Sequence, residues 1–162
     1  MRIHLAANSE GYRAARSVQE ELITAGHEVV WHAAPEFDEG DDYPGIAIRA
    51  VQAVVHDEDA GRDARALILG GSGAGEVIAA NKVNGARVVS ATDPAYVVDA
   101  RARADINGLV IPTAHVAPST VPALIDALLA TAFSNDLDDA RRLVNVAEFE
   151  AAGTIEGWTI EE

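Results

Sequence analysis

A glycine-rich stretch that ends in a glutamate is the part of this sequence best suited to chemistry. Residues 70–76 read GGSGAGE, with four glycines in the first six positions and Glu76 directly after them. Glycine lets the backbone approach a ligand closely and point successive N–H groups at it, so such a loop suits an anion or an oxyanion formed during a reaction. A strand-to-helix turn without any ligand is the structural alternative.

Glu76 favours one kind of chemistry at this loop. A carboxylate beside an oxyanion-binding loop can remove a proton from a carbon next to a carbonyl, while the N–H groups hold the enediolate that forms. The alternative is an ordinary first-turn glutamate, which the helix dipole favours. The spacing does not fit a P-loop, because Lys82 lies too far on, and it fits a dinucleotide-binding fingerprint only in part.

Composition excludes several function classes. The 162 residues carry a net charge of −14, which argues against binding to nucleic acid or to an anionic membrane surface. The chain has no cysteine, and its five histidines show no metal-ligand spacing, so we expect no metal and no other cofactor. No apolar run approaches the roughly 20 residues that span a bilayer. The chain opens on a strand-like pattern without a signal peptide, and we expect a cytoplasmic protein.

The elements that must position the loop alternate along the chain. We predict strands over 2–7, 27–32, 65–71, 86–92 and 108–113, and helices over 11–26, 44–56, 75–82, 94–104, 118–133 and 136–152. This alternation predicts an α/β fold: a single Rossmann-like αβα sandwich with a five-stranded parallel sheet and a C-terminal helix. Ser119 or Thr120 is the expected N-terminal cap of the fifth helix.

The predicted domain covers residues 1–150 and is followed by a tail over 151–162. In that tail Trp158 and Ile160 alternate with polar residues, and we expect the tail to pack on a partner chain. In parallel sheets of this kind, ligands bind beyond the carboxyl ends of the strands. The loops after the first, third, fourth and fifth strands therefore matter most, including His115, which is either an acid at the site or an exposed loop histidine.

The glycine loop also carries a family resemblance. Residues 68–87, ILGGSGAGEVIAANKVNGAR, resemble the signature of the sugar-phosphate isomerase family that contains ribose-5-phosphate isomerase B and the two subunits of galactose-6-phosphate isomerase. Weaker matches at Gly11–Tyr12, Asp41–Pro44, Ala100–Arg101 and 133–143 extend the resemblance over residues 1–146.

The resemblance implies an aldose–ketose isomerase that works through a cis-enediolate on a sugar or sugar phosphate. It also implies a homodimer, or a tetramer built from it, in which each active site uses residues from both chains. One branch of the family has a cysteine base at the position of Gly71, and the other uses a glutamate at the position of Glu76, so this chain resembles the glutamate branch. Ser72 and the N–H groups of Gly73 to Gly75 would hold the substrate oxygens, and Tyr43 would line the pocket.

The chain departs from the family pattern at several polar positions. The Asp-His pair of the first loop is Asn8-Ser9 here, and the alanine after it is Glu10. Arg103 stands where the family has the histidine associated with ring opening, and Ala104 replaces the asparagine beside it.

The phosphate ligands of the family are also depleted. Ala114 and Asp138 stand at the positions of two phosphate-binding arginines, Asp139 replaces a histidine, and Arg142 or its neighbour Arg141 remains. Several charge-assisted hydrogen bonds, each worth roughly 1.5–3 kcal/mol, normally hold a phosphate dianion. We therefore predict a substrate shifted from ribose 5-phosphate. The predicted catalytic residues are Glu76 and Ser72, and the predicted substrate-binding residues are Asn8, Ser9, Tyr43, Gly71, Gly73, Gly75, Arg103 and Arg142.

Three functions remain open from the sequence. The first is an isomerase with Glu76 as its base. The second is a catalytically impaired subunit of a heteromeric isomerase, which completes a partner's site with Arg103 and Asn8. The third is a small-molecule binding module on the same scaffold.

Overall fold

A parallel sheet forms the centre of the molecule. The computed structural model describes residues 1–155, which contain β1 (Arg2–Ala7), β2 (Glu28–Trp31), β3 (Ala64–Gly70), β4 (Val88–Ser90) and β5 (Gly108–Pro112). Their order in the sheet is β2-β1-β3-β5-β4, and every neighbouring pair is parallel. β3 is therefore the central strand, and the glycine-rich loop begins at its carboxyl end.

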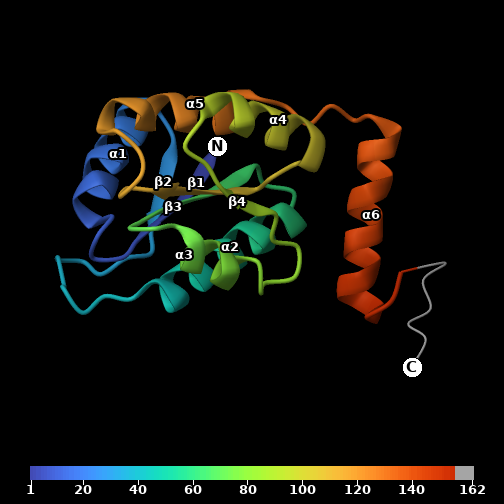
Figure 1. Cartoon of the computed structure of the whole chain (residues 1–162), viewed down its shortest axis with the longest axis horizontal. Coiled ribbons are helices and arrows are strands. Elements are labelled where there is room, and N and C mark those ends of the chain that lie inside the picture. The colour runs from blue at the N-terminus through green and yellow to red at the C-terminus, as the bar shows by residue number, and fades with distance from the viewer. Residues whose placement is uncertain (156–162) are drawn as a thin grey trace.

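Helices cover both faces of the sheet (Figure 1). They are α1 (Tyr12–Thr24), α2 (Tyr43–Asp59), α3 (Ala74–Ala80), α4 (Pro94–Ala104), α5 (Val121–Ala130) and α6 (Leu137–Ala152), with a 3-10 turn, η1 (Pro118–Thr120), before α5. α1, α4 and α5 pack on one face, and α2 and α3 pack on the other. In β3, Leu67 and Leu69 face the first layer while Ala66 and Ile68 face the second, which explains its continuous apolar run.

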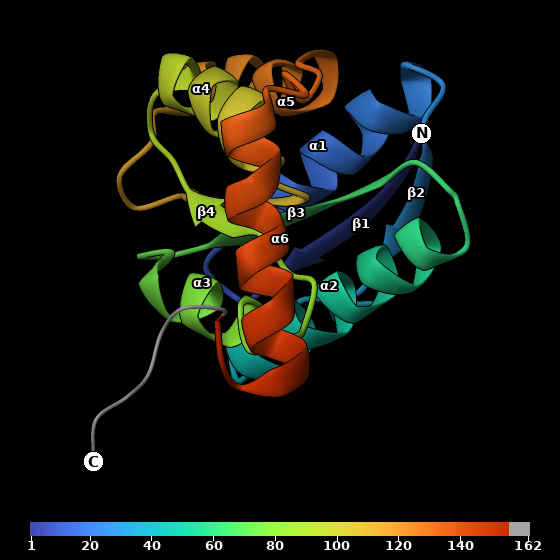
Figure 2. The same ribbon diagram turned by 90° about the vertical axis from the view of Figure 1, so that its right-hand side faces the viewer.

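α6 stands away from the two layers, on the side opposite the glycine-rich loop (Figures 1 and 2). Glu150 Oε2 accepts a hydrogen bond of 2.8 Å from the Gly85 N–H, which precedes the amino end of β4. Leu137, Val144 and Phe149 on this helix are exposed. α6 is thus an amphipathic helix whose apolar side chains are only partly covered by its own chain.

The predicted α/β sandwich with a five-stranded parallel sheet is confirmed, with element ends displaced by a few residues. The predicted side-chain cap at Ser119 or Thr120 is wrong. The Thr120 N–H bonds to the Ala117 carbonyl within the 3-10 turn, and Pro122 has no N–H for a capping side chain to accept. The expected packing of Trp158 and Ile160 on a partner lies outside the described residues. Within residues 1–155, no helix is both long and apolar enough to cross a bilayer.

Candidate active site

The glycine-rich loop is held in place by the end of β5. Gly70 O accepts two hydrogen bonds from Thr113, one from its N–H at 2.7 Å and one from Oγ1 at 3.0 Å. The Ala114 N–H donates to Gly71 O at 3.0 Å. Two successive carbonyls therefore have partners in the segment directly after β5, and the loop leaves the sheet in a defined direction.

Glu76 is buried against this loop. Its side chain lies in the first turn of α3, and the residue is 2% exposed. A Cβ at Gly70 would lie 1.9 Å from Glu76 Oε1, so the carboxylate occupies space that only a glycine leaves free. Asn8 Nδ2 donates to the same Oε1 at 3.2 Å.

Asn8 links the first loop to the glycine-rich loop. Besides its bond to Glu76, the Asn8 side chain accepts a hydrogen bond of 3.1 Å from the Gly11 N–H through Oδ1. The amide group therefore has a fixed orientation, with its NH₂ toward Glu76. A Cβ at Gly11 would lie 2.0 Å from the Leu69 carbonyl oxygen, so the first loop lies directly against the end of β3, where the glycine-rich loop begins. The structure brings the predicted residues Asn8 and Glu76 together.

The backbone of the loop presents open N–H groups. Gly73 has a φ of 77°, in the left-handed region that favours glycine, and this conformation starts α3. Within residues 1–155, the N–H groups of Ser72, Gly73 and Gly75 have no hydrogen-bond acceptor. The Ser72 side chain accepts a hydrogen bond from the Ala74 N–H at 3.4 Å through Oγ. Donors without internal partners, beside a carboxylate, form an arrangement that can bind an oxyanion.

Tyr43 covers another part of the loop. A Cβ at Gly75 would lie 2.4 Å from Tyr43 Cζ and 2.7 Å from the phenol oxygen, so the ring lies directly over this glycine. Ser9 lies nearby, because its N–H is 3.5 Å from the Asp41 carbonyl oxygen, two residues before Tyr43. The prediction placed both residues at the site, and the structure brings them to the same edge of the sheet.

Glu10 also lies at the glycine-rich loop, although the sequence reasoning did not select it. A Cβ at Gly71 would lie 2.0 Å from Glu10 Oε2 and 2.7 Å from Oε1, so both carboxylate oxygens lie over Gly71. The available signal was the carboxylate that replaces alanine in the first loop. Its position over the glycine could not be read from the sequence, because 61 positions separate the two residues.

Arg103 and Arg142 lie elsewhere in this chain. α4 begins after the carboxyl end of β4 and returns to the amino end of β5, so Arg103 is at the edge of the sheet opposite Glu76. Arg142 Nη1 is 2.5 Å from Asp139 Oδ1, and Arg103 Nε is 3.9 Å from Asp139 Oδ2. The structure joins the two arginines to each other through Asp139 but does not bring them to the glycine-rich loop of their own chain. His115 is exposed in the loop after β5.

A buried charged cluster connects β1 to α2 outside this site. Asp57 is 2% exposed and bonds to His4 Nε2 at 3.0 Å, to Arg62 at 2.8 Å and to Arg2 at 3.1 Å. The hydrogen bond from His4, together with those from Arg62 and Arg2, lowers the pKa of Asp57 below its usual value. His4 Nδ1 is 2.9 Å from His32 Nε2.

The His32 ring at the end of this cluster is partly buried. Burial, with smaller contributions from His4 and Arg49, lowers the pKa of His32 to about 4. The imidazole is therefore neutral at physiological pH. The cluster shares no residue with the glycine-rich loop, and it stabilises the packing of α2 on the sheet.

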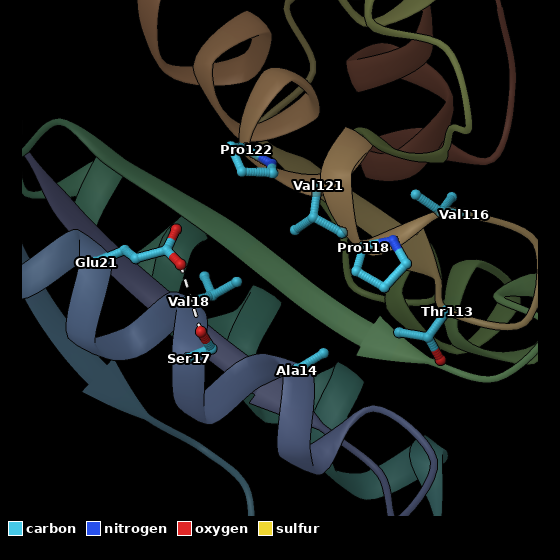
Figure 3. Close-up of a pocket in the computed structure, with 9 residues that line it drawn as sticks. All are labelled: Ala14, Ser17, Val18, Glu21, Thr113, Val116, Pro118, Val121 and Pro122. Atoms are coloured by element: carbon cyan, nitrogen blue, oxygen red, sulfur yellow. Dashed lines mark hydrogen bonds between the residues drawn. The ribbon is translucent and has the colours of Figure 1, made fainter.

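A small apolar cavity of about 150 Å³ lies between α1 and the segment that leads into α5 (Figure 3). Ala14 and Val18 line it from α1, and Val116 and Val121 line it from the other side. It contains none of the predicted site residues. Thr113 lines one end of the cavity and also donates a hydrogen bond to Gly70 O. It therefore connects the cavity to the glycine-rich loop.

The fold and the site define a class of protein: an α/β sandwich with a buried carboxylate against a glycine-rich loop, at the carboxyl edge of a parallel sheet. Residues 3–146 match the family described as Ribose/Galactose Isomerase, and the chain belongs to this family of sugar-phosphate isomerases.

Relatives and solved structures agree with this assignment. Ribose-5-phosphate isomerase B of Mycobacterium leprae (strain TN) is 37% identical over 153 residues, covering 93% of this chain and 90% of the relative. The enzyme of the same name from Mycobacterium tuberculosis (strain ATCC 25618 / H37Rv) is 34% identical over 150 residues with the same coverage. The structure of ribose-5-phosphate isomerase B from Mycoplasma genitalium with bound ribulose 5-phosphate superposes with a TM-score of 0.87 at 25% identity, covering 93% of this chain and 97% of that one.

Proposed function

We propose that this protein is an aldose–ketose isomerase of a sugar or sugar phosphate, with Glu76 as the base. The observation that carries the proposal is the buried Glu76 carboxylate, which lies over Gly70 beside loop N–H groups that have no acceptor among the residues that the structure describes. The family assignment supports the reaction class, since its named relatives are ribose-5-phosphate isomerases.

In this reaction Glu76 removes the proton from C2 of the open-chain aldose, which gives a cis-enediolate, and returns it to C1 to form the ketose. The N–H groups of Ser72, Gly73 and Gly75 stabilise the charge that develops on the substrate oxygens. Asn8 acts through Glu76: its amide holds Oε1, so that Oε2 is directed toward the substrate. General-base catalysis of this kind contributes about 10²–10⁴-fold to the rate.

The arginines favour a site shared between two chains. Arg103 and Arg142 lie at the opposite edge of the sheet from Glu76, so a substrate at Glu76 can contact them only if they come from a partner subunit. The apolar side chains that α6 leaves exposed next to these arginines are consistent with such a partner. We therefore propose a homodimer in which the partner's Arg103 and the partner's Arg142 complete the site.

The substrate is the part of the proposal in which this chain differs from its relatives. Asp139 bonds to Arg142 and lies near Arg103, and Asp138 is 3.5 Å from Arg141. Arg103, Arg141 and Arg142 therefore each have a carboxylate within 3.9 Å. A phosphate dianion would have to compete with these carboxylates, so we propose a substrate other than ribose 5-phosphate, with either no phosphate or a differently placed one.

Proton exchange in heavy water tests the proposal. The purified protein is incubated with tetroses, pentoses, hexoses and their phosphates, and NMR detects deuterium at the carbon next to the carbonyl. We expect exchange and ketose formation with at least one compound, and loss of both in Glu76→Gln. Glu20→Gln, an exposed change on α1, is the matched control. Exchange that persists in Glu76→Gln would remove Glu76 as the base.

The separation of Arg103 and Arg142 from Glu76 also favours a second candidate, a subunit of a heteromeric isomerase. Such a subunit would supply its arginines to another family member and would show little turnover alone. Measurements of mass in solution and of turnover on the same purified sample separate the two: an active homodimer supports the first candidate, and an inactive monomer supports the second.

A further inference from the structure

We propose that Glu10 is a second catalytic residue, which moves a proton between the two substrate oxygens while Glu76 moves the proton between the two carbons. This inference rests on the proposed isomerase function. It starts from the position of the Glu10 carboxylate, whose two oxygens lie within 2.0 and 2.7 Å of the place where a Cβ at Gly71 would be.

The glycines of the loop make room for side chains that can act on a substrate. Gly70 leaves space for the Glu76 carboxylate and Gly71 for the Glu10 carboxylate. Since Gly70 and Gly71 are consecutive, the two carboxylates lie over successive residues of one backbone segment. Two carboxylates at one oxyanion-binding loop are enough for acid–base chemistry at both the carbons and the oxygens of an enediolate.

The two carboxylates differ in their surroundings, and this difference assigns their roles. Glu76 is buried, and Asn8 holds one of its oxygens, so it suits the removal of a weakly acidic carbon-bound proton. Glu10 is exposed, and it has no hydrogen-bond or ion-pair partner within residues 1–155. Its oxygens are therefore free to accept and return a proton at a substrate hydroxyl.

The proton balance of the proposed step is complete. Glu76 takes the proton from C2, and the electron pair moves to the former carbonyl oxygen, which leaves O1 negative and O2 still protonated. The ionised Glu10 takes the proton from O2 and delivers it to O1. Glu76 then returns its proton to C1 as the carbonyl forms at C2. Both carboxylates end in their starting state, and no other reactant is required.

The geometry of a cis-enediolate fits this transfer. Its O1 and O2 lie on the same side of the double bond, so a carboxylate can place one oxygen at each of them. Both Glu10 oxygens lie close to Gly71, at 2.0 and 2.7 Å from the place of its Cβ, so both are near the loop as acceptors. The N–H groups of Ser72 and Gly73 then remain available to stabilise the negative oxygen.

The test compares two rates in one NMR experiment in heavy water, with the tetroses, pentoses, hexoses and their phosphates of the panel above, D-ribose among them, as separate probes. Exchange of the C2 proton reports the action of Glu76, and ketose formation also requires the transfer between O2 and O1. For Glu10→Gln we expect exchange within about threefold of wild type and ketose formation lower by about 10²-fold. The exchange-to-conversion ratio should rise by the same factor.

Two further variants make the result independent of one substitution. Gly71→Ala places a methyl group where the Glu10 oxygens lie, and it should raise the same ratio while Glu10 itself is still present. In Glu10→Ala, added sodium formate should restore ketose formation in proportion to its concentration, because a free carboxylate can replace the lost one.

The proposal is overturned if Glu10→Gln leaves the ratio unchanged, or if it lowers exchange and conversion together. No exchange with any compound of the panel in the wild-type protein would overturn the proposed isomerase function, and the role of Glu10 with it. Exchange in the wild type with an unchanged ratio in Glu10→Gln would overturn the role of Glu10 alone.

Discussion

Gly70→Ala tests whether Glu76 depends on the space that this glycine leaves free. The new Cβ would lie 1.9 Å from Glu76 Oε1, and real Cβ atoms essentially never come closer than 3.0 Å to a neighbour. The carboxylate must therefore move by about 1.1 Å or more. A displacement of about 1 Å in a catalytic group can cost 10²-fold in rate. The bond from Asn8, already 3.2 Å long, would be weakened as well.

We expect both C2-proton exchange and ketose formation to fall by about 10²-fold in Gly70→Ala. Thermal unfolding and circular dichroism should show that the fold is retained, because Gly70 lacks the positive φ that only glycine adopts easily. Gly71→Ala is the matched control, since its methyl group meets Glu10 and not Glu76, so exchange should persist there. Wild-type exchange in a folded Gly70→Ala protein would refute the placement of Glu76 as the base.

Three other predictions concern charged groups. Because the folded-state pKa of His32 is about 4 and the unfolded value about 6.5, the unfolded chain binds a proton first, and stability falls as pH drops from about 6.5 to 4. Solvent screening at this partly exposed ring limits the loss of unfolding free energy to roughly 1–2 kcal/mol. His32→Gln should flatten the pH dependence of stability measured by urea unfolding. His56→Gln, an exposed change, should leave that pH dependence intact. Asp57→Ala should cost about 3–5 kcal/mol of unfolding free energy at pH 7, because it removes the buried partner of His4, Arg2 and Arg62; a loss below 1 kcal/mol in urea titrations would contradict this. Asp139→Asn removes the carboxylate that binds Arg142. It should lower the KM for ribose 5-phosphate by about tenfold, because Arg142 can then form one charge-assisted hydrogen bond to the phosphate. An unchanged KM would contradict the shared phosphate site.

Local patterns in the sequence predicted the elements of the fold well. The continuous apolar run before Gly70 predicted a strand covered on both faces, and alternating strands and helices predicted the parallel sheet. The strand order was not predicted, because pairing between β3 and β5 depends on packing between distant segments. The position of α6, away from both layers, was not predicted either, since its amphipathic pattern is the same whether its own chain or another covers it.

The site was predicted in part for the same reason. Glu76 and its loop are contiguous, so their types and spacing were visible. The bond between Asn8 and Glu76 and the place of Glu10 over Gly71 join residues more than 60 positions apart, and one sequence contains no signal for such contacts. The cluster of His4, His32 and Asp57 was missed because its members come from three separate segments, β1, the residue after β2, and α2, and none carries a local signal of the contact.

The central place of β3 in the sheet also bears on how the chain is made. A ribosome delivers β1 and β3 well before β5, so β3 can pair on one side while its other edge stays open. Until residues 108–113 follow, Gly70 O has no Thr113 to bind, and the glycine-rich loop lacks its anchor. A nascent chain that stops short of β5 therefore exposes an apolar strand edge, which invites aggregation, and it cannot hold Glu76 in place. Activity should appear late in synthesis, and fragments that end before Thr113 should depend on chaperones.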